Sequence, residues 1–468
     1  MKKIFIIVLS LLPAGLYAQS AINADVMKEL KAGFKNTAAD KAVRNALNNK
    51  GVNDLAQTNA VPFYDSTFTY RVKTSGVTNQ HSSGRCWAFC SMNMLRAGIK
   101  AERNLGDFMF SQSYIYFYDV LEKANQKLTF QIELCDSKDD SPEFVWVANG
   151  YGDGGSFIQF ANLAKKYGLV PKAVMPETFT SNHTAKMRQL INLKLKEDFM
   201  VFRHTYESAV KGLSGKKKEA AAAKAREKMQ VMKVDMLKDI YRILCLCIGT
   251  PPQEFTYYTY DSKGKVTGEK VYTPKSFYDE YVGKDLTEEY VYVGNNPARE
   301  YGKVYVTERG IGVYGGKDIY MINIPIEKMK EIAIASLRGG SPMYLGCDVG
   351  KFKTQGWSDP SNYDYDSLLG VHFGMDKGDR VRTGDSGSTH AMNLIAVQLK
   401  EGKPARWMVE NSWGNKGYNG NVILSDDWFN EYAFSLCVKK EYVPADVMGL
   451  LGNEPVKRKP WDPTDIHE

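Results

Sequence analysis

Residues 80–87 read Gln80-His81-Ser82-Ser83-Gly84-Arg85-Cys86-Trp87, and they place a cysteine between a glycine turn and an amphipathic run. The apolar residues that follow recur largely at three- and four-residue spacing: Trp87, Phe89, Cys90, Met94 and Leu95. This spacing predicts a helix with Cys86 in its first turn. Free N–H groups and the positive end of the helix dipole would lower the pKa of the thiol from about 8.5. The stretch is therefore typical of a thiolate nucleophile.

Gln80 lies six residues before this cysteine, on the incoming loop. Its side-chain amide and the backbone N–H of Cys86 would supply two donors for an oxyanion. The alternative is a buried cysteine at the start of a core helix, which is the commoner place for a free cysteine. The rest of the chain favours the nucleophile.

A nucleophilic cysteine needs a base, and the histidines are His81, His183, His204, His372, His390 and His467. His390 opens an apolar run of strand character, and a second such run, Arg406 to Asn411, follows the turn signal Lys400 to Pro404. In a hairpin centred near residue 402, His390 lies roughly opposite residues 411 to 414, so Asn411 can reach the imidazole. Trp413 would cover that hydrogen bond against water. A histidine on a strand is more often structural, but this pairing together with Cys86 favours a triad.

These residues resemble one family. Gln80, Ser83 to Trp87, Thr389-His390-Ala391 and Glu410 to Gly414 resemble the papain superfamily, specifically its bleomycin hydrolase and aminopeptidase C branch. Ordinary papain-like endopeptidases carry a second cysteine three residues before the nucleophile, where this chain has Ser83. Further segments also resemble the branch: Phe110 to Tyr114, Asp153-Gly154-Gly155, Gly346 to Gly350 and Pro460 to Pro463.

The resemblance implies an α+β fold: a papain-like two-lobe cysteine peptidase, with a helical lobe, a β-rich lobe, a large helical insertion and a C-terminal arm. It implies that Cys86 is the nucleophile, His390 the general base and acid, Asn411 the orienting residue and Gln80 the oxyanion donor. Gly154 and Gly155 would offer backbone groups to a peptide substrate in the manner of an added strand. Without the resemblance, an ordinary turn is the simpler interpretation of these glycines. The reaction that the resemblance implies is peptide hydrolysis through a thioester, and no cofactor or metal is expected.

The C-terminus distinguishes an aminopeptidase from an endopeptidase. In the resembled family a C-terminal arm enters the cleft and presents its terminal carboxylate, here that of Glu468, to the free amine of the substrate. The tail Thr464 to Glu468 is more acidic than the family's usual small, apolar tail. A frayed terminus with an open cleft would leave an endopeptidase, and a non-catalytic peptide-binding protein of the same fold is a third possibility. The resemblance also implies a homohexamer.

The N-terminus indicates export. Met1-Lys2-Lys3 precedes a short apolar run and Leu16-Tyr17-Ala18, which is typical of a secretory signal peptide cleaved near Ala18. No cysteine directly follows the run, so no lipid anchor is indicated. We therefore expect a periplasmic or secreted protein, whereas many members of the resembled family are cytosolic.

The expected organisation follows from these features. It comprises a signal peptide at 1–18, an N-terminal helical arm at 19–61, a helical lobe with the nucleophile at 62–180, a family-type insertion at 181–335, a β-rich lobe at 336–440 and a C-terminal arm at 441–468.

Composition excludes some other functions. The seven cysteines lack the regular spacing of a disulfide framework or a zinc site, so neither is predicted. The basic stretch Lys211 to Lys238 suggests nucleic-acid binding at first sight. Interleaved acidic residues and a net charge of only +7, or +5 once Lys2 and Lys3 are removed with the signal peptide, favour a solvated helix face instead.

Overall fold

The computed structural model describes residues 21–59, 67–310 and 312–466. The expected signal peptide therefore lies outside the described residues. So does Glu468, whose terminal carboxylate is expected to bind the free amine of the substrate. The chain divides into two compact units, one formed by residues 1–59 with 363–373 and the other by 60–362 with 374–468.

The first unit is built from short helices. They are α1 (Ala24–Gly33), α2 (Ala38–Leu47), α3 (Val52–Ala56) and α14 (Tyr365–Leu369). Thr37 and Asp40 form a capping box that starts α2, because each side chain accepts a backbone N–H of the other residue. Asp364 N–H donates to the Ala56 carbonyl at 2.8 Å, so the α14 segment joins α3.

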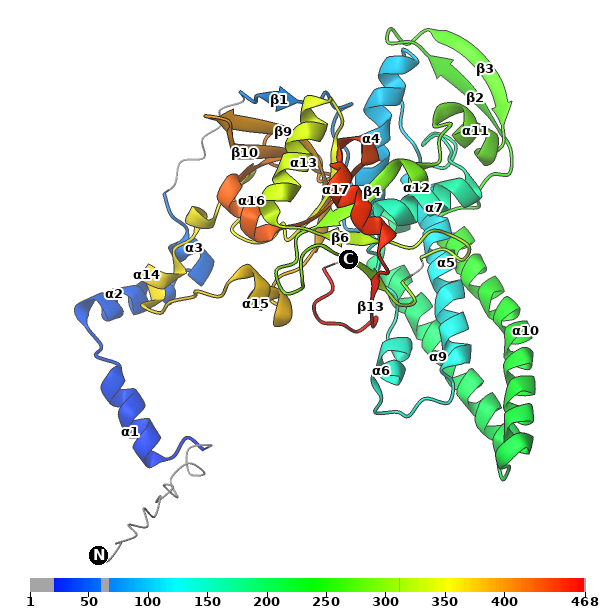
Figure 1. The fold of residues 1–468 in the computed structure, drawn as a ribbon, viewed down its shortest axis with the longest axis horizontal. Coiled ribbons are helices and arrows are strands. Elements are labelled where there is room, and N and C mark those ends of the chain that lie inside the picture. Colours follow the sequence, from blue (N-terminus) through cyan, green and yellow to red (C-terminus); the bar gives the residue numbers. More distant parts are fainter. Residues whose placement is uncertain (1–20, 60–66, 311, 467–468) are drawn as a thin grey trace, which may run out of the picture. The chain divides into compact units, whose positions relative to one another are not determined.

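The second unit begins with a helical part. It comprises α4 (Cys86–Glu102), α5 (Gln112–Glu133), α6 (Pro142–Ala148), α7 (Phe157–Tyr167), α8 (Phe179–Asn182), α9 (Ala185–Val210), α10 (Gly215–Cys247), α11 (Pro274–Tyr281) and α12 (Leu286–Glu289). Ser111 and Ser156 cap α5 and α7 through their hydroxyls, which accept the free N–H groups of the first turns. The long helices α9 and α10 pack side by side (Figure 1), and a separate hairpin pairs β2 (Phe255–Tyr260) with β3 (Val266–Tyr272).

A mixed sheet forms the rest of this unit. Its order within the described residues is β13 (Val456–Arg458), β5 (Lys303–Thr307), β6 (Met321–Asn323), β4 (Tyr290–Gly294), β12 (Ala433–Lys439), β7 (Met343–Cys347), β9 (His390–Lys400), β10 (Lys403–Glu410), β11 (Asn421–Ser425) and β8 (Trp357–Ser358), with β1 (Tyr70–Arg71) also paired to β9. Strands β4, β5 and β6 come from residues 290–323. The segment expected as a helical insertion thus also builds part of the sheet.

Both faces of the sheet are covered. One face packs on the helical part, where Tyr292, Tyr344, Ala391 and Cys437 join the core that contains Cys86 and Trp87. The other face is covered by α13 (Ile326–Arg338), α16 (Asp426–Tyr432) and α17 (Ala445–Gly449). Burial on both faces explains why the central strands β4, β7 and β12 are buried along almost their whole length rather than at alternate residues.

The predicted hairpin is present as β9 and β10. Lys400 pairs with Lys403 across the turn Glu401-Gly402, whose residues both have positive φ, as a two-residue type I′ turn requires. Asn393 pairs with Glu410 at the far end of the ladder. With this register, His390, the first residue of β9, lies opposite the residues that directly follow Asn411.

Candidate active site

Cys86 begins α4, as its sequence context predicts. Cys86 is 5% exposed, and the first helical hydrogen bonds to the Arg85 carbonyl come from Ala88 and Phe89. The N–H groups of Cys86 and Trp87 therefore lie in the first turn, where a helix has no internal acceptors for them. This position favours negative charge at the sulfur.

The turn before Cys86 is held by polar contacts. The Ser83 hydroxyl donates to the Gln80 carbonyl at 2.5 Å and accepts from Arg85 Nε at 3.0 Å. Gly84 is required here, because a Cβ at this position would lie 2.5 Å from the Cβ of Asp153. Ser83, which stands where the resembled endopeptidases have a disulfide cysteine, closes the turn through hydrogen bonds.

Arg85 makes a buried ion pair that the sequence did not reveal. Its guanidinium is fully buried and lies 2.8 Å from a Glu177 carboxylate oxygen. Burial by itself would raise the pKa of Glu177, but the charge and hydrogen bond of Arg85 outweigh it and lower that pKa. Ser82 N–H also donates to the Asn182 carbonyl at 3.0 Å, so the segment around α8 supports the nucleophile turn.

His390 and Asn411 form the hydrogen bond expected from their hairpin positions. His390 Nε2 lies 2.8 Å from Asn411 Oδ1, and the Trp413 ring lies 4.7 Å from the imidazole, centroid to centroid. Burial lowers the pKa of His390 to about 4; the Asn411 hydrogen bond opposes this shift, and the charge of Lys353 adds to it. The site therefore favours a neutral imidazole, which is the form that accepts a proton.

Gln80 joins the nucleophile loop to the segment after Asn411. Its Nε2 donates to the Ser83 carbonyl at 2.6 Å, and its Oε1 accepts from the Ser412 hydroxyl at 2.6 Å. The Gln80 backbone N–H also donates to the Ser412 carbonyl at 2.8 Å. An amide nitrogen carries two protons, so this anchored side chain keeps one proton for an oxyanion.

The nucleophile helix packs directly against the strand that carries the base. Cys90, one turn after Cys86, donates its thiol to Asn393 Oδ1 at 3.0 Å, and Asn393 lies on β9 three residues after His390. Cys86 and Ala391 share one hydrophobic core. Helix α4 and strand β9 thus bring the first turn with Cys86 to the start of the strand with His390.

Gly154 and Gly155 lie beside this site, and each of their carbonyl oxygens accepts a hydrogen bond from a side chain of the protein. Gly154 accepts from Lys123 Nζ at 2.5 Å, and Gly155 accepts from the Tyr344 hydroxyl at 3.1 Å. Gly155 also packs so closely on Trp87 that a Cβ would lie 2.7 Å from the indole. The sequence could have indicated the ion pair of Lys123 with Asp119, because an acid and a base four residues apart on a helix lie next to each other. No comparable pattern indicates the contact of Tyr344.

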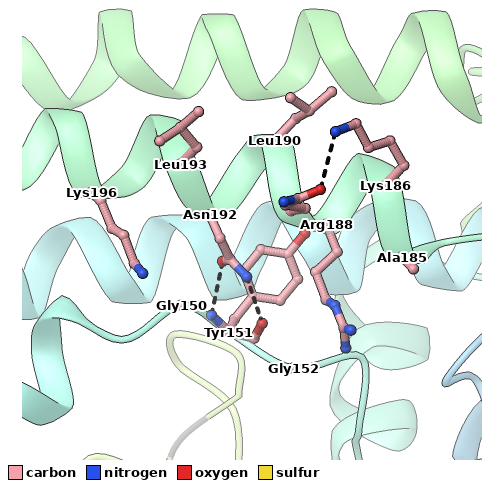
Figure 2. Close-up of a pocket in the computed structure, with 11 residues that line it drawn as sticks. Gly150, Tyr151, Gly152, Ala185, Lys186, Arg188, Leu190, Asn192, Leu193 and Lys196 are labelled. Carbon is pink, nitrogen blue, oxygen red and sulfur yellow. Dashed lines mark hydrogen bonds between the residues drawn. The ribbon is translucent and has the colours of Figure 1, made fainter.

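A cavity of about 610 Å³ lies between residues 150–152, at the start of the same loop, and α9 (Figure 2). It is lined by Gly150 to Gly152 and by α9, which contributes Lys186, Arg188 and Lys196. Figure 2 shows the Asn192 amide bonded to both backbone groups of Tyr151, each at 3.0 Å. The loop is therefore tied to α9 as well as to α5.

The C-terminal arm is described as far as Ile466. Asn296 Nδ2 donates to the Thr464 carbonyl at 2.8 Å, and Asp465 pairs with Arg458 at 3.1 Å. Ile466 is 2% exposed and packs with Phe434, beside the first residue of β12. Because Ala433 pairs with Cys347 and Cys347 pairs with His390, the arm is anchored at the end of the sheet where strand β9 begins.

The remaining expectations concern metals, disulfides and membranes. In the described residues no group of three or more His, Cys, Asp or Glu side chains could hold a metal ion. In the part of the chain that the structure describes, which includes all seven cysteines, no disulfide joins two of them. Within the ranges the structure describes, no helix is both long and apolar enough to cross a membrane.

Comparison with known proteins places this geometry in a family. The model of the Peptidase C1-like family matches residues 21–465. Aminopeptidase C of Lactobacillus delbrueckii subsp. lactis is 33% identical over 94% of this chain and 97% of its own length. Bleomycin hydrolase of Rattus norvegicus is 34% identical over 83% of this chain and 85% of its own length.

A solved structure gives the same assignment. The crystal structure of PepW from Lactobacillus rhamnosis matches with a TM-score of 0.85 and 32% identity, covering 95% of this chain and 98% of that one. The match extends over both the helical part and the sheet, so it includes the packing of α4 on β9. The chain is a papain-like cysteine peptidase and belongs to the Peptidase C1-like family, in its bleomycin hydrolase and aminopeptidase C branch.

Proposed function

We propose that this protein is an exported cysteine aminopeptidase that removes N-terminal residues from peptides through a thioester intermediate. The observation that carries the proposal is the His390–Asn411 hydrogen bond of 2.8 Å on the strand that packs against the helix begun by Cys86. Relatives named aminopeptidase C and bleomycin hydrolase support the same reaction.

The residues have the following roles in this proposal. Neutral His390 accepts the proton of Cys86, and the thiolate attacks the carbonyl carbon of the first peptide bond. The Gln80 amide and the Cys86 N–H stabilise the oxyanion of the tetrahedral intermediate. The imidazolium then protonates the leaving amine as the C–N bond breaks and the thioester remains.

Hydrolysis of the thioester completes the cycle. Water loses a proton to His390 and attacks the acyl carbon, and the thiolate leaves, to be protonated again by the imidazolium. Asn411 accepts the hydrogen bond of one ring nitrogen, which fixes the tautomer that leaves the other nitrogen basic. Trp413 shields that hydrogen bond from water.

The arm supports exopeptidase action. The arm is anchored as far as Ile466 at the end of the sheet where β9 begins. The two residues beyond Ile466 can extend the chain by at most about 7 Å. This reach is compatible with a terminal carboxylate, that of Glu468, close to the substrate's ammonium group. Occlusion of the cleft by this end restricts cleavage to the first peptide bond.

A comparison of free-amine and N-acetylated fluorogenic peptides tests the activity. We expect cleavage of free-amine peptides only, and loss of cleavage in Cys86→Ala. Equal cleavage of acetylated peptides would instead identify an endopeptidase with an open cleft. Unchanged activity of Cys86→Ala would mean that the protein does not use this thiol in the reaction. A complete lack of turnover by the unmodified protein would indicate a peptide-binding protein without catalytic activity.

Export and assembly are separate parts of the proposal. The basic start and short apolar run support cleavage near Ala18, which N-terminal sequencing of protein recovered from the producing cells would test. A homohexamer is proposed from the resemblance to bleomycin hydrolase. Light scattering of the mature protein tests it, and a monomer at working concentration would contradict it.

A further inference from the structure

The last described residues of the chain are held by side chains that follow strands of the sheet. Asn296 Nδ2 donates to the Thr464 carbonyl at 2.8 Å, and Arg299 Nε donates to the Thr464 hydroxyl at 2.6 Å. A second nitrogen of Arg299 pairs with the Asp462 carboxylate. Because Asn296 and Arg299 come directly after β4, the segment that follows this strand fixes the arm at residues 462 and 464.

Asp465 makes a second, separate attachment. Its Oδ1 lies 3.1 Å from a guanidinium nitrogen of Arg458, and its Oδ2 accepts from the Thr307 hydroxyl at 2.7 Å. Arg458 ends β13, and Thr307 ends β5, which pairs with β13. The Arg458 side chain is 5% exposed and that of Asp465 is 18% exposed. Since water screens this pair little, it fixes residue 465 more firmly than an exposed ion pair would.

Ile466 adds an apolar contact to these polar ones. It is 2% exposed and packs in a small cluster that includes Phe434. Phe434 directly follows Ala433, which lies two strands from His390 in the sheet. Neighbouring strands are about 4.8 Å apart, so these two backbones are about 10 Å apart. The two residues beyond Ile466 can cover most of such a distance, since they reach at most about 7 Å.

This short reach makes the position of the attachment decisive. A shift of the arm by one residue moves the chain by about 3.5 Å, which is half of the reach that remains. The attraction between a carboxylate and an ammonium group is strong only in direct contact, and in water it is weak at about 7 Å. The terminal carboxylate therefore meets the substrate's ammonium group only while residues 464–466 keep their place.

We propose that Arg299 and Arg458 are positioning residues for substrate specificity, because the contacts that they make with Thr464 and Asp465 set where the terminal carboxylate lies. Asp465 holds the arm and does not itself bind the substrate's ammonium group, since both of its carboxylate oxygens bind side chains of the protein. The proposal rests on the proposed aminopeptidase function and deepens it. It also gives the acidic character of this tail a role in attachment.

Isosteric replacements in the tail test the proposal. Thr464→Val removes the hydroxyl that Arg299 binds, and Asp465→Asn removes the charge that Arg458 binds. Both kcat and KM are measured with alanine coumarylamide, whose amine is free, and kcat/KM is measured with its N-acetyl derivative. We expect the double variant to raise KM for the free-amine substrate about tenfold, the equivalent of one hydrogen bond to a charged group, while kcat changes less than twofold. Cleavage of the acetylated substrate should increase, so that the preference for a free amine falls more than tenfold.

Glu308→Gln is the matched control. Glu308 pairs at 2.7 Å with Lys459, the residue directly after Arg458, so it also fixes the end of β13 with an ion pair. No contact of Glu308 involves Thr464 or Asp465 among those that hold the arm. The control should therefore keep both KM and the preference for a free amine.

The proposal is overturned if the double variant keeps the KM and the preference of the unmodified enzyme. It is also overturned if Asp465→Asn alone raises KM without any gain on the acetylated substrate, because Asp465 would then bind the ammonium group directly. A form without residues 464–468 separates this failure from that of the proposed function. If that form still rejects the acetylated substrate, the arm does not occlude the cleft and the proposed role of the arm fails; if it accepts the acetylated substrate and the double variant does not, only the attachment is refuted.

Discussion

Burial of His390 makes the stability of this protein sensitive to acid. Burial lowers the pKa of His390 to about 4, whereas an imidazole in the unfolded chain titrates near 6.5. Between these values the unfolded chain binds a proton that the folded protein does not, so stability falls as the pH decreases through this window. Each pKa unit corresponds to about 1.4 kcal/mol, so the full loss is about 3 kcal/mol, of which about 2 kcal/mol has occurred by pH 5.

Replacement of the ring isolates this contribution. Urea unfolding of Cys86→Ala, which removes the chemistry, is compared with Cys86→Ala/His390→Gln at pH 7.5 and pH 5.0 by tryptophan fluorescence. We expect the parent to lose about 2 kcal/mol more than the double variant between these pH values, because only the parent must keep an imidazole neutral.

His183 provides a matched control, since it is an exposed histidine that stacks on Phe179. His183→Gln in the same background should lose as much stability as the parent. The reasoning is refuted if the parent and the His390→Gln variant lose equal stability, or if the His390 ring protons titrate near pH 6.5 in the NMR spectrum of the folded protein.

Three further predictions concern the nucleophile turn. Gln80→Ala should lower kcat about 10²- to 10³-fold with little change in KM, because one oxyanion donor is lost; steady-state kinetics would contradict this if kcat were retained. Gly84→Ala places a Cβ 2.5 Å from that of Asp153 and should destabilise the protein by about 1–3 kcal/mol in urea unfolding, and an unchanged midpoint would show that the turn relaxes freely. Glu177→Ala leaves the buried Arg85 charge without its partner and should cost about 3–5 kcal/mol; thermal unfolding measures it, and a loss below about 1 kcal/mol would show that water or another acid reaches Arg85.

The local features of the site were predictable from short patterns. The start of α4 at Cys86 follows from apolar spacing after a glycine turn, and the β9–β10 hairpin follows from two strand-like runs around Glu401-Gly402. The His390–Asn411 hydrogen bond followed in turn, because the turn sets the register of the hairpin and the two register shifts within the ladder cancel before its far end.

The contacts between distant segments were not predictable in this way. The Arg85–Glu177 pair, the Tyr344 bond to Gly155 and the Lys123 bonds to the loop join residues for which no spacing rule exists. The expectation that residues 181–335 form a helical insertion likewise took no account of β4, β5 and β6, because short apolar strands carry little periodicity.

The amino-acid sequence by itself therefore determined the chemistry of this protein: a cysteine at a helix start, a histidine that begins one strand of a hairpin and an asparagine that directly follows the other, each specified by residues close in the chain. The tertiary structure alone decided which distant side chains hold the loops of the site in place. Hydrogen-bond donors from four elements converge on the loop at residues 151–155 only after α4, α5, α9 and β7 have packed, and which donor a carbonyl meets depends on what the fold places beside it.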